Sequence, residues 1–66
     1  MRQSELIRDY LLQGLPLTAI EALNMFGCYR LAARVLELKK QGYPIERDTM
    51  KTSGGAHVAR YFMVHN

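Results

Sequence analysis

The sequence lacks the cysteine pairs, long apolar runs and apolar leader that define several common classes of small protein. Its single cysteine, Cys28, cannot form an internal disulfide, which excludes a disulfide-stapled secreted miniprotein. No stretch approaches the roughly 18 apolar residues of a membrane span. Residues 1–10, MRQSELIRDY, carry charges throughout and lack the apolar middle of a signal peptide. We therefore expect a cytoplasmic protein with no membrane partner.

Side chains arranged for catalysis or metal binding are also missing. Cys28, His57 and His65 show neither the CxxC nor the HxxxH spacing of metal sites, so we expect no metal and no cofactor. No nucleophile is paired with a base, and His57 stands alone beside a turn. Buried packing explains Cys28 better than reactivity does. These absences indicate a binding protein rather than an enzyme.

The composition is that of one small globular domain, residues 1–66. Hydrophobic residues make up 48% and charged residues 23%, unlike a disordered chain. A chain this short buries only about 60% of its unfolded surface, so association into oligomers is open. The net charge of +3 is concentrated in residues 28–66, which hold seven basic and three acidic residues, whereas residues 1–27 hold two and three. This asymmetry favours a polyanionic partner.

Residues 28–41, CYRLAARVLELKKQ, are expected to form the amphipathic helix around which the chain is organised. Its apolar positions recur at i, i+4 and i+7 and suit a core: Leu31, Val35 and Leu38. The other side begins with two arginines beside a small residue: Arg30, Ala33 and Arg34. Considered alone, this is an ordinary amphipathic helix with a solvated basic face. The alternative is a helix that enters the major groove of DNA.

The first part of the chain predicts a helix and a short strand. Residues 4–13 have an apolar face, with Ser4 as the N-cap and Gly14 as the C-terminal stop. Residues 15–17, LPL, are expected to form a brief strand at a hairpin edge, where the missing donor of proline is tolerated.

A second helix, residues 18–26, has the clearest local signal. Thr18 and Glu21 form a capping box, in which each side chain accepts a hydrogen bond from the other residue's backbone amide. Its wide apolar surface includes Ile20. Gly27 ends the helix and supplies a sharp turn. A short helix, a glycine turn and a longer amphipathic helix form a helix-turn-helix pattern. In the commonest DNA-binding form an alanine lies four residues before the turn glycine, whereas Ala22 lies five residues before Gly27.

The remaining residues predict a β-hairpin. Residues 45–52 are a modest strand with imperfect alternation, which allows a bulge. Ser-Gly-Gly at 53–55 makes the turn, and residues 57–64 are rich in β-branched and aromatic side chains. We assign the Tyr61 face of this strand to the core. Phe62 is then partly exposed, as a homodimer contact or under cover from Leu17.

Three helices followed by a two-stranded hairpin, with a glycine turn between the second and third helices, define an α+β winged helix-turn-helix fold. Residues 17–61 resemble the small helix-turn-helix proteins of bacteriophages and prophages. The resemblance is carried by LTAIEAL at 17–23, FGCYRLAARVLELKKQGYPIE at 26–46 and VARY at 58–61. It implies a winged helix, binding to double-stranded DNA, and a bacterial or phage-infected cell as the setting.

In such folds the first half of the recognition helix faces the base edges. Arg30 and Arg34 are one turn apart and can each bond bidentately to guanine. Ala33 between them allows close approach or touches a thymine methyl group. Tyr29 can reach a phosphate, with half-buried packing as the alternative. Thr18 starts a helix whose N-terminus can bind a phosphate, although capping is its main role.

The wing supplies residues for the DNA backbone or minor groove: Lys51, Thr52, Ser53, Gly54 and His57. The alternative is a plain solvated turn, because Ser-Gly-Gly suits any tight turn. Lys39 and Lys40, at the far end of the 28–41 helix, are expected to be solvated.

Three functions remain open. The first is a sequence-specific transcriptional regulator of a phage or prophage. The second is an excisionase-like architectural protein that bends DNA with the same surface. The third is an interaction module whose basic face and Phe62 bind an acidic host protein, since a fold does not determine function.

Overall fold

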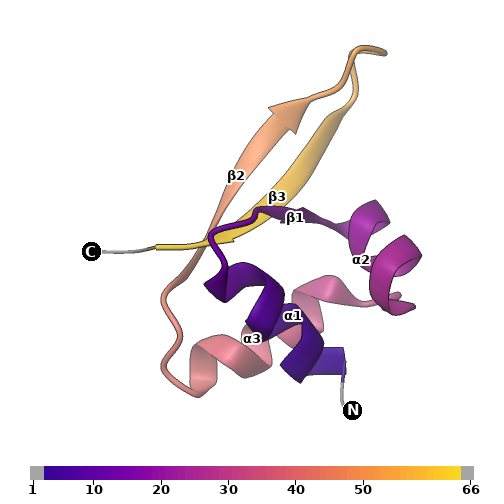
Figure 1. Cartoon of the computed structure of the whole chain (residues 1–66). Helices are drawn as coiled ribbons and strands as arrows, with labels where there is room; N and C mark the ends of the chain where they lie inside the picture. Colours follow the sequence, from indigo (N-terminus) through magenta and orange to yellow (C-terminus); the bar gives the residue numbers. More distant parts are fainter. Residues whose placement is uncertain (1–2, 65–66) are drawn as a thin grey trace.

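The computed structural model describes residues 3–64 and contains three helices and a three-stranded antiparallel sheet (Figure 1). The elements follow in the order α1 (Gln3–Leu12), β1 (Leu17–Thr18), α2 (Ala19–Phe26), α3 (Leu31–Lys40), β2 (Ile45–Lys51) and β3 (His57–Met63). This order confirms the predicted α+β winged helix. His65, considered above as a metal ligand, lies outside the described residues.

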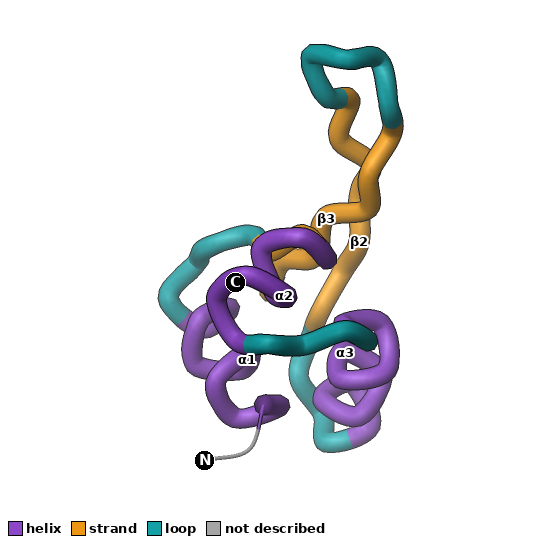
Figure 2. The backbone as a smooth tube through the Cα atoms, turned by 90° about the vertical axis from the view of Figure 1, so that its right-hand side faces the viewer, coloured by secondary structure: helices purple, strands orange, loops and turns teal. Residues whose placement is uncertain are grey.

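β3 is the central strand of the sheet, with β1 on one side and β2 on the other. Leu17 of β1 lies opposite Tyr61, so a short strand does lie at the hairpin edge. It spans Leu17–Thr18 and shares only Leu17 with the predicted 15–17 strand. β2 pairs with β3 residue by residue from Ile45 to Lys51. The bulge that the imperfect alternation allowed does not occur between these two strands, because unbroken pairing leaves no extra residue on either of them. The hairpin projects beyond the helices and carries residues 52–56 at its tip (Figure 2).

The core lies between the helices and the base of the sheet. Its buried members are Ile7, Leu11, Leu17, Ala22, Cys28, Leu31, Val35, Leu38, Ile45 and Met63. They include all three α3 residues of the predicted apolar stripe. Tyr61 packs against this core, so the Tyr61 face of β3 points inward as predicted. The rings of Tyr10 and Phe26 meet edge to face, 5.7 Å between centroids, and join α1 to α2.

The predicted N-cap of the first helix is wrong, and one residue on the apolar surface of the second helix is exposed. Gln3 is already helical, so Ser4 lies inside α1 and is not its N-cap. Gln3 instead donates from Nε2 to the carbonyl oxygen of Gly27 at 2.9 Å, which ties α1 to the turn after α2. Ile20 is 61% exposed and is not part of the core. It lies two positions before buried Ala22, which places the two side chains on nearly opposite sides of the helix.

Both ends of α2 follow their local signals. The hydroxyl of Thr18 accepts a hydrogen bond from the amide of Glu21, and the Glu21 carboxylate accepts one from the Thr18 amide at 2.9 Å, which confirms the capping box. Gly27 adopts the left-handed conformation at φ +66°. The chain then turns through residues 27–30 before α3 begins.

α3 is shorter than the predicted 28–41 helix and starts at Leu31. The amide of Cys28 donates to the carbonyl of Ala22 at 3.2 Å, so Cys28 belongs to the turn that closes α2. Arg30 is the N-cap, with φ −127° and ψ 65°, and it makes no side-chain capping hydrogen bond. At the other end, Gly42 at φ +103° redirects the chain, as predicted.

Candidate nucleic-acid interface

The positive charges of the described chain fall into two groups. Three arginines form ion pairs: Arg8 with Asp9 at 3.0 Å, Arg34 with Glu37 at 2.8 Å and Arg60 with Asp48 at 2.8 Å. The other cations of residues 3–64 are exposed and have no ion-pair partner there: Arg30, Lys39, Lys40, Arg47 and Lys51. We call these five residues the free cations. All of them belong to α3, its N-cap or β2.

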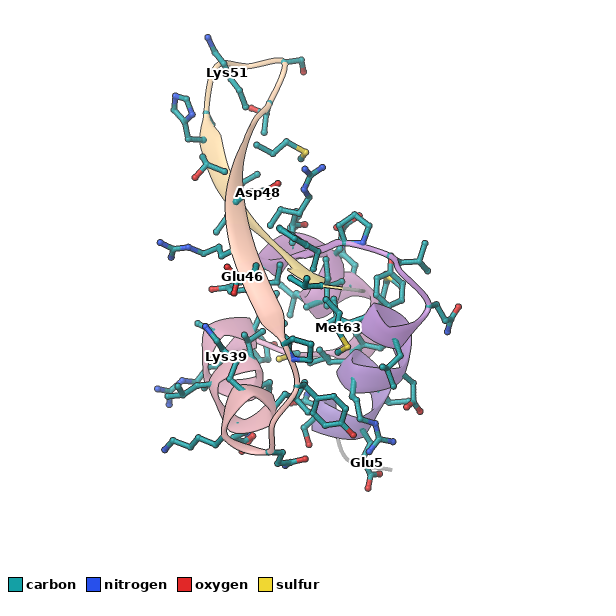
Figure 3. The ribbon with its side chains drawn as sticks, turned by 90° about the vertical axis from the view of Figure 1, so that its left-hand side faces the viewer. Glu5, Lys39, Glu46, Asp48, Lys51 and Met63 are labelled. Atoms are coloured by element: carbon teal, nitrogen blue, oxygen red, sulfur yellow. The ribbon has the colours of Figure 1, made fainter. Side chains whose placement is uncertain are left out.

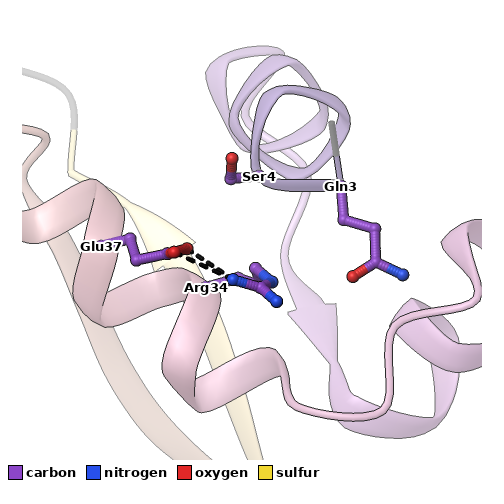
Figure 4. A pocket seen from close by; sticks show the side chains of 4 residues that line it. All are labelled: Gln3, Ser4, Arg34 and Glu37. Carbon is purple, nitrogen blue, oxygen red and sulfur yellow. Dashed lines mark hydrogen bonds and ion pairs between the residues drawn. The ribbon is translucent and has the colours of Figure 1, made fainter. Parts of the chain in front are cut away.

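One flank of α3 faces α1. There Arg34 donates from Nη1 to both carboxylate oxygens of Glu37, at 2.9 and 2.8 Å. Arg34 and Glu37 line a hollow with Gln3 and Ser4 of α1 (Figure 4). The hydrogen bonds with Glu37 raise the pKa of the Arg34 guanidinium above its usual value. The sequence placed Arg34 on an open outer face beside Arg30, whereas the structure turns it toward α1 and gives it a partner.

The other flank of α3 faces α2 and the hairpin. Ala32 lines a groove of about 450 Å³, which also borders the start of α2 and strand β3. Further groove residues are Thr18, Ala19, Ile20, Tyr29, Arg30, Leu31, Val58, Ala59 and Tyr61. Ala32, Leu36 and Lys39 follow at i, i+4 and i+7 and are all exposed, so they continue this flank along α3. Figure 3 shows Lys39 and Lys51 on the side of the molecule away from α1.

The structure brings three of the sequence-predicted residues together around this groove: Thr18, Tyr29 and Arg30. Thr18 is only 5% exposed and its hydroxyl is engaged in the capping box. Tyr29 is 85% exposed, so the alternative of half-buried packing is wrong. Within the turn, the side chain of Cys28 is buried in the core and that of Tyr29 is exposed to solvent. Ala33 is half-buried on α3.

The predicted wing residues lie apart from this groove, at the far end of the hairpin (Figure 1). Lys51, Ser53, Gly54 and His57 are exposed there. Thr52 is half-buried, and its hydroxyl accepts a hydrogen bond from the amide of Ala56 at 3.2 Å. The wing tip can therefore reach a surface that the helices do not.

Sequence reasoning missed Arg47 as a candidate contact. Arg47 pairs with Tyr61 across the sheet and lies on the same face as Ile45, Thr49 and Lys51. The period of two in side-chain direction along a strand was the signal that could have found it, because buried Ile45 identifies the inward face of β2. Arg47 and Lys51 thus form a basic face of the hairpin.

The opposite face of the hairpin is acidic and partly neutralised. Asp48 lies directly across from Arg60, which donates from Nε at 3.1 Å and from Nη2 at 2.8 Å. The hydrogen bonds from Arg60 lower the pKa of Asp48 below its usual range, and they raise that of Arg60. Glu46 and Asp48 share this face, so the hairpin separates its charges by side.

Within residues 3–64, no cluster of three or more His, Cys, Asp or Glu side chains could hold a metal ion. No helix of this part of the chain has the length and apolar character needed to cross a membrane.

The structure has three packed helices, a turn between α2 and α3, and a hairpin whose Lys51 lies on the same side of the molecule as Lys39 of α3. This arrangement defines a winged helix-turn-helix domain, a fold that binds DNA. The comparison with protein families agrees: the model of the winged helix-turn-helix domain matches residues 2–66. The chain belongs to this family. No curated protein and no solved structure matches it significantly.

Proposed function

We propose that this chain is a sequence-specific DNA-binding protein that places α3 in the major groove and the hairpin on the adjacent backbone or minor groove. In this proposal it acts in the cytoplasm as a small transcriptional regulator of phage or prophage origin. The sequence resemblance to small phage proteins motivates that origin. The observation that carries DNA binding is the segregation of the free cations, which all lie on α3, its N-cap or β2.

The spacing of these charges suits a duplex. Arg30 and Lys40 stand at the two ends of α3, roughly 15 Å apart along its axis. In a major groove about 12 Å wide, this spacing lets Arg30 reach the base edges while Lys40 lies within reach of a phosphate at the side of the groove. Arg47 and Lys51 are roughly 13 Å apart along β2 and extend the positive surface outward. Arg30 and Ala33 then lie at the base edges and Tyr29 reaches a phosphate, as the sequence predicts. Arg34, the third base contact that the sequence predicts, is instead paired with Glu37.

The start of α2 supports the same arrangement. Thr18 uses both its amide and its hydroxyl within the capping box, so it acts by determining where α2 begins. Ala19 and Ile20, the next two residues, line the groove beside α3. Their amides are among the first of the helix and are free to donate to a phosphate.

The test is DNA binding measured by fluorescence anisotropy across a salt series, with sheared genomic DNA and a randomised duplex pool as probes. Wild type is expected to lose affinity steeply as salt rises, because phosphate contacts release counterions. Arg47→Ala with Lys51→Ala should flatten the log–log salt slope by about 1 for each cation removed. Arg8→Ala is the matched control, since Arg8 lies on α1 and is paired with Asp9. Its slope should equal that of wild type.

The remaining functions are outcomes of related measurements. A large bend in a circular-permutation gel assay assigns the architectural, excisionase-like role instead of the regulator. Failure to bind either probe at low salt overturns DNA binding and leaves the interaction module.

A further inference from the structure

Leu36 is a large apolar side chain on the open face of α3. It is 54% exposed, although the same helix buries three other apolar residues. It lies one turn after Ala32 and one turn before Lys40, and Ala33 is its other neighbour on this face. On this face no hydrogen-bonding side chain lies between the helix start and the two lysines of the last turn, Lys39 and Lys40. The centre of the exposed face is therefore apolar, with cations at its two ends.

Nearby charged groups do not change this character. Glu37 follows Leu36 in the chain but is held by Arg34 on the α1 flank. Arg30 lies at the N-cap, and Lys39 and Lys40 lie in the last turn. Lys39 and Lys40 suit phosphates and Arg30 suits a base edge at the start of the helix, which leaves the apolar centre of the helix to face the bases between them.

We infer that Leu36 reads the C5 methyl group of thymine in the major groove. This inference rests on the proposed function, because it needs α3 in that groove. Each base pair presents acceptors and donors there, and only thymine adds an apolar group. A leucine placed against acceptor or donor groups desolvates them without a hydrogen bond, which is costly. Leu36 therefore favours thymine over the other three bases at the position that it faces.

The experiment begins with a duplex selected by wild type from a randomised pool. That duplex is then made with deoxyuridine in place of each thymidine in turn, which removes only the C5 methyl group. Loss of one buried methyl group should weaken binding about fourfold at one or two positions. Leu36→Ala should bind the thymidine and deoxyuridine duplexes with nearly equal affinity, which assigns the methyl effect to this side chain.

Leu12→Ala is the matched control, because Leu12 is also an exposed leucine but lies on α1. It should retain the full discrimination against deoxyuridine. Equal binding of both duplexes by wild type overturns the inference and leaves DNA binding intact. Discrimination that survives in Leu36→Ala also overturns it. If no duplex is selected or bound at low salt, the proposed function fails instead, and the inference fails with it.

Discussion

Arg34 shows how the surroundings of a residue change its expected role. In the sequence it stands one turn after Arg30 and looks equally available to DNA. In the structure Arg30 is exposed at the N-cap, whereas Arg34 lies on the α1 flank and donates to both carboxylate oxygens of Glu37. An arginine held in this way must release its carboxylate before it can bond to a base.

Replacing each arginine separately tests this difference. Arg30→Ala should lose about 1–3 kcal/mol of binding free energy on the selected duplex, the usual range for an arginine at a base edge. Arg34→Ala should lose less, because its charge is already neutralised by Glu37. Both affinities can be measured by anisotropy at one salt concentration. A larger loss for Arg34→Ala would show that Arg34 exchanges Glu37 for a base when DNA binds, as the sequence alone predicts.

At the scale of elements, the relation between α2 and α3 depends on the turn at Gly27. Its φ of +66° lies in the left-handed region, and an added Cβ would meet no atom within 4 Å. The cost of a side chain here is therefore conformational rather than steric.

Gly27→Ala should lower the free energy of unfolding by about 1–2 kcal/mol. Urea denaturation followed by circular dichroism measures this change. Gly54→Ala is the matched control, because Gly54 has no positive φ and its nearest atom to an added Cβ is 4.0 Å away. Equal stability of the two variants would contradict the role assigned to the left-handed turn.

The hairpin has a pH-dependent contact of its own. Hydrogen bonds from Arg60 hold the pKa of Asp48 below its usual range. Because the pKa is lower in the folded chain than in the unfolded chain, the pair contributes stability above the unfolded value. That contribution is lost as the pH falls through the lower, folded value.

Asp48→Asn should abolish this part of the acid sensitivity. In urea unfolding repeated from neutral to strongly acidic solution, wild type should lose more stability than the variant. The difference is expected to be small, because both side chains are partly exposed. Glu46→Gln removes a carboxylate from the same strand that has no ion pair within residues 3–64, and its profile should follow that of wild type.

At the scale of the whole molecule, size restricts what one chain can recognise. A single module of this kind buries about 600–1,000 Å² on DNA. That is at most about a fifth of the 4620 Å² surface of the described chain. The affinity and specificity of one chain for DNA are therefore limited. Cooperative binding of two chains to adjacent sites increases both without any new contact to DNA within each chain.

We expect two chains to bind adjacent half-sites cooperatively, with Phe62 as a contact between them. Phe62 is half-buried on the hairpin face that points away from the core. Sedimentation of the complex with the selected duplex should give two chains per site, and Phe62→Ala should reduce this to one. Met25→Ala, which alters an exposed apolar residue of α2, should still give two. One wild-type chain per site would exclude this form of assembly.

Most of the fold was predictable because its signals are local. The capping box at Thr18, the glycine turn at Gly27 and the i, i+4, i+7 stripe of α3 each depend on a few neighbouring residues. The start of α3 was placed three residues early because the amphipathic pattern continues into the turn. The hydrogen bond from the Cys28 amide to the Ala22 carbonyl, which the sequence does not show, assigns Cys28 to the turn and not to α3.

The candidate interface was less predictable for a physical reason. The sequence by itself determined the winged helix order, the buried stripe of α3 and the concentration of positive charge after residue 28. It could not say which flank of α3 packs beside α1, because both flanks lie at similar angles from the buried stripe. Contacts between residues distant in the sequence determine the arrangement. The flank of α3 with Arg34 lies beside α1, whereas the flank with Leu36 and Lys39 is exposed beside α2 and the hairpin.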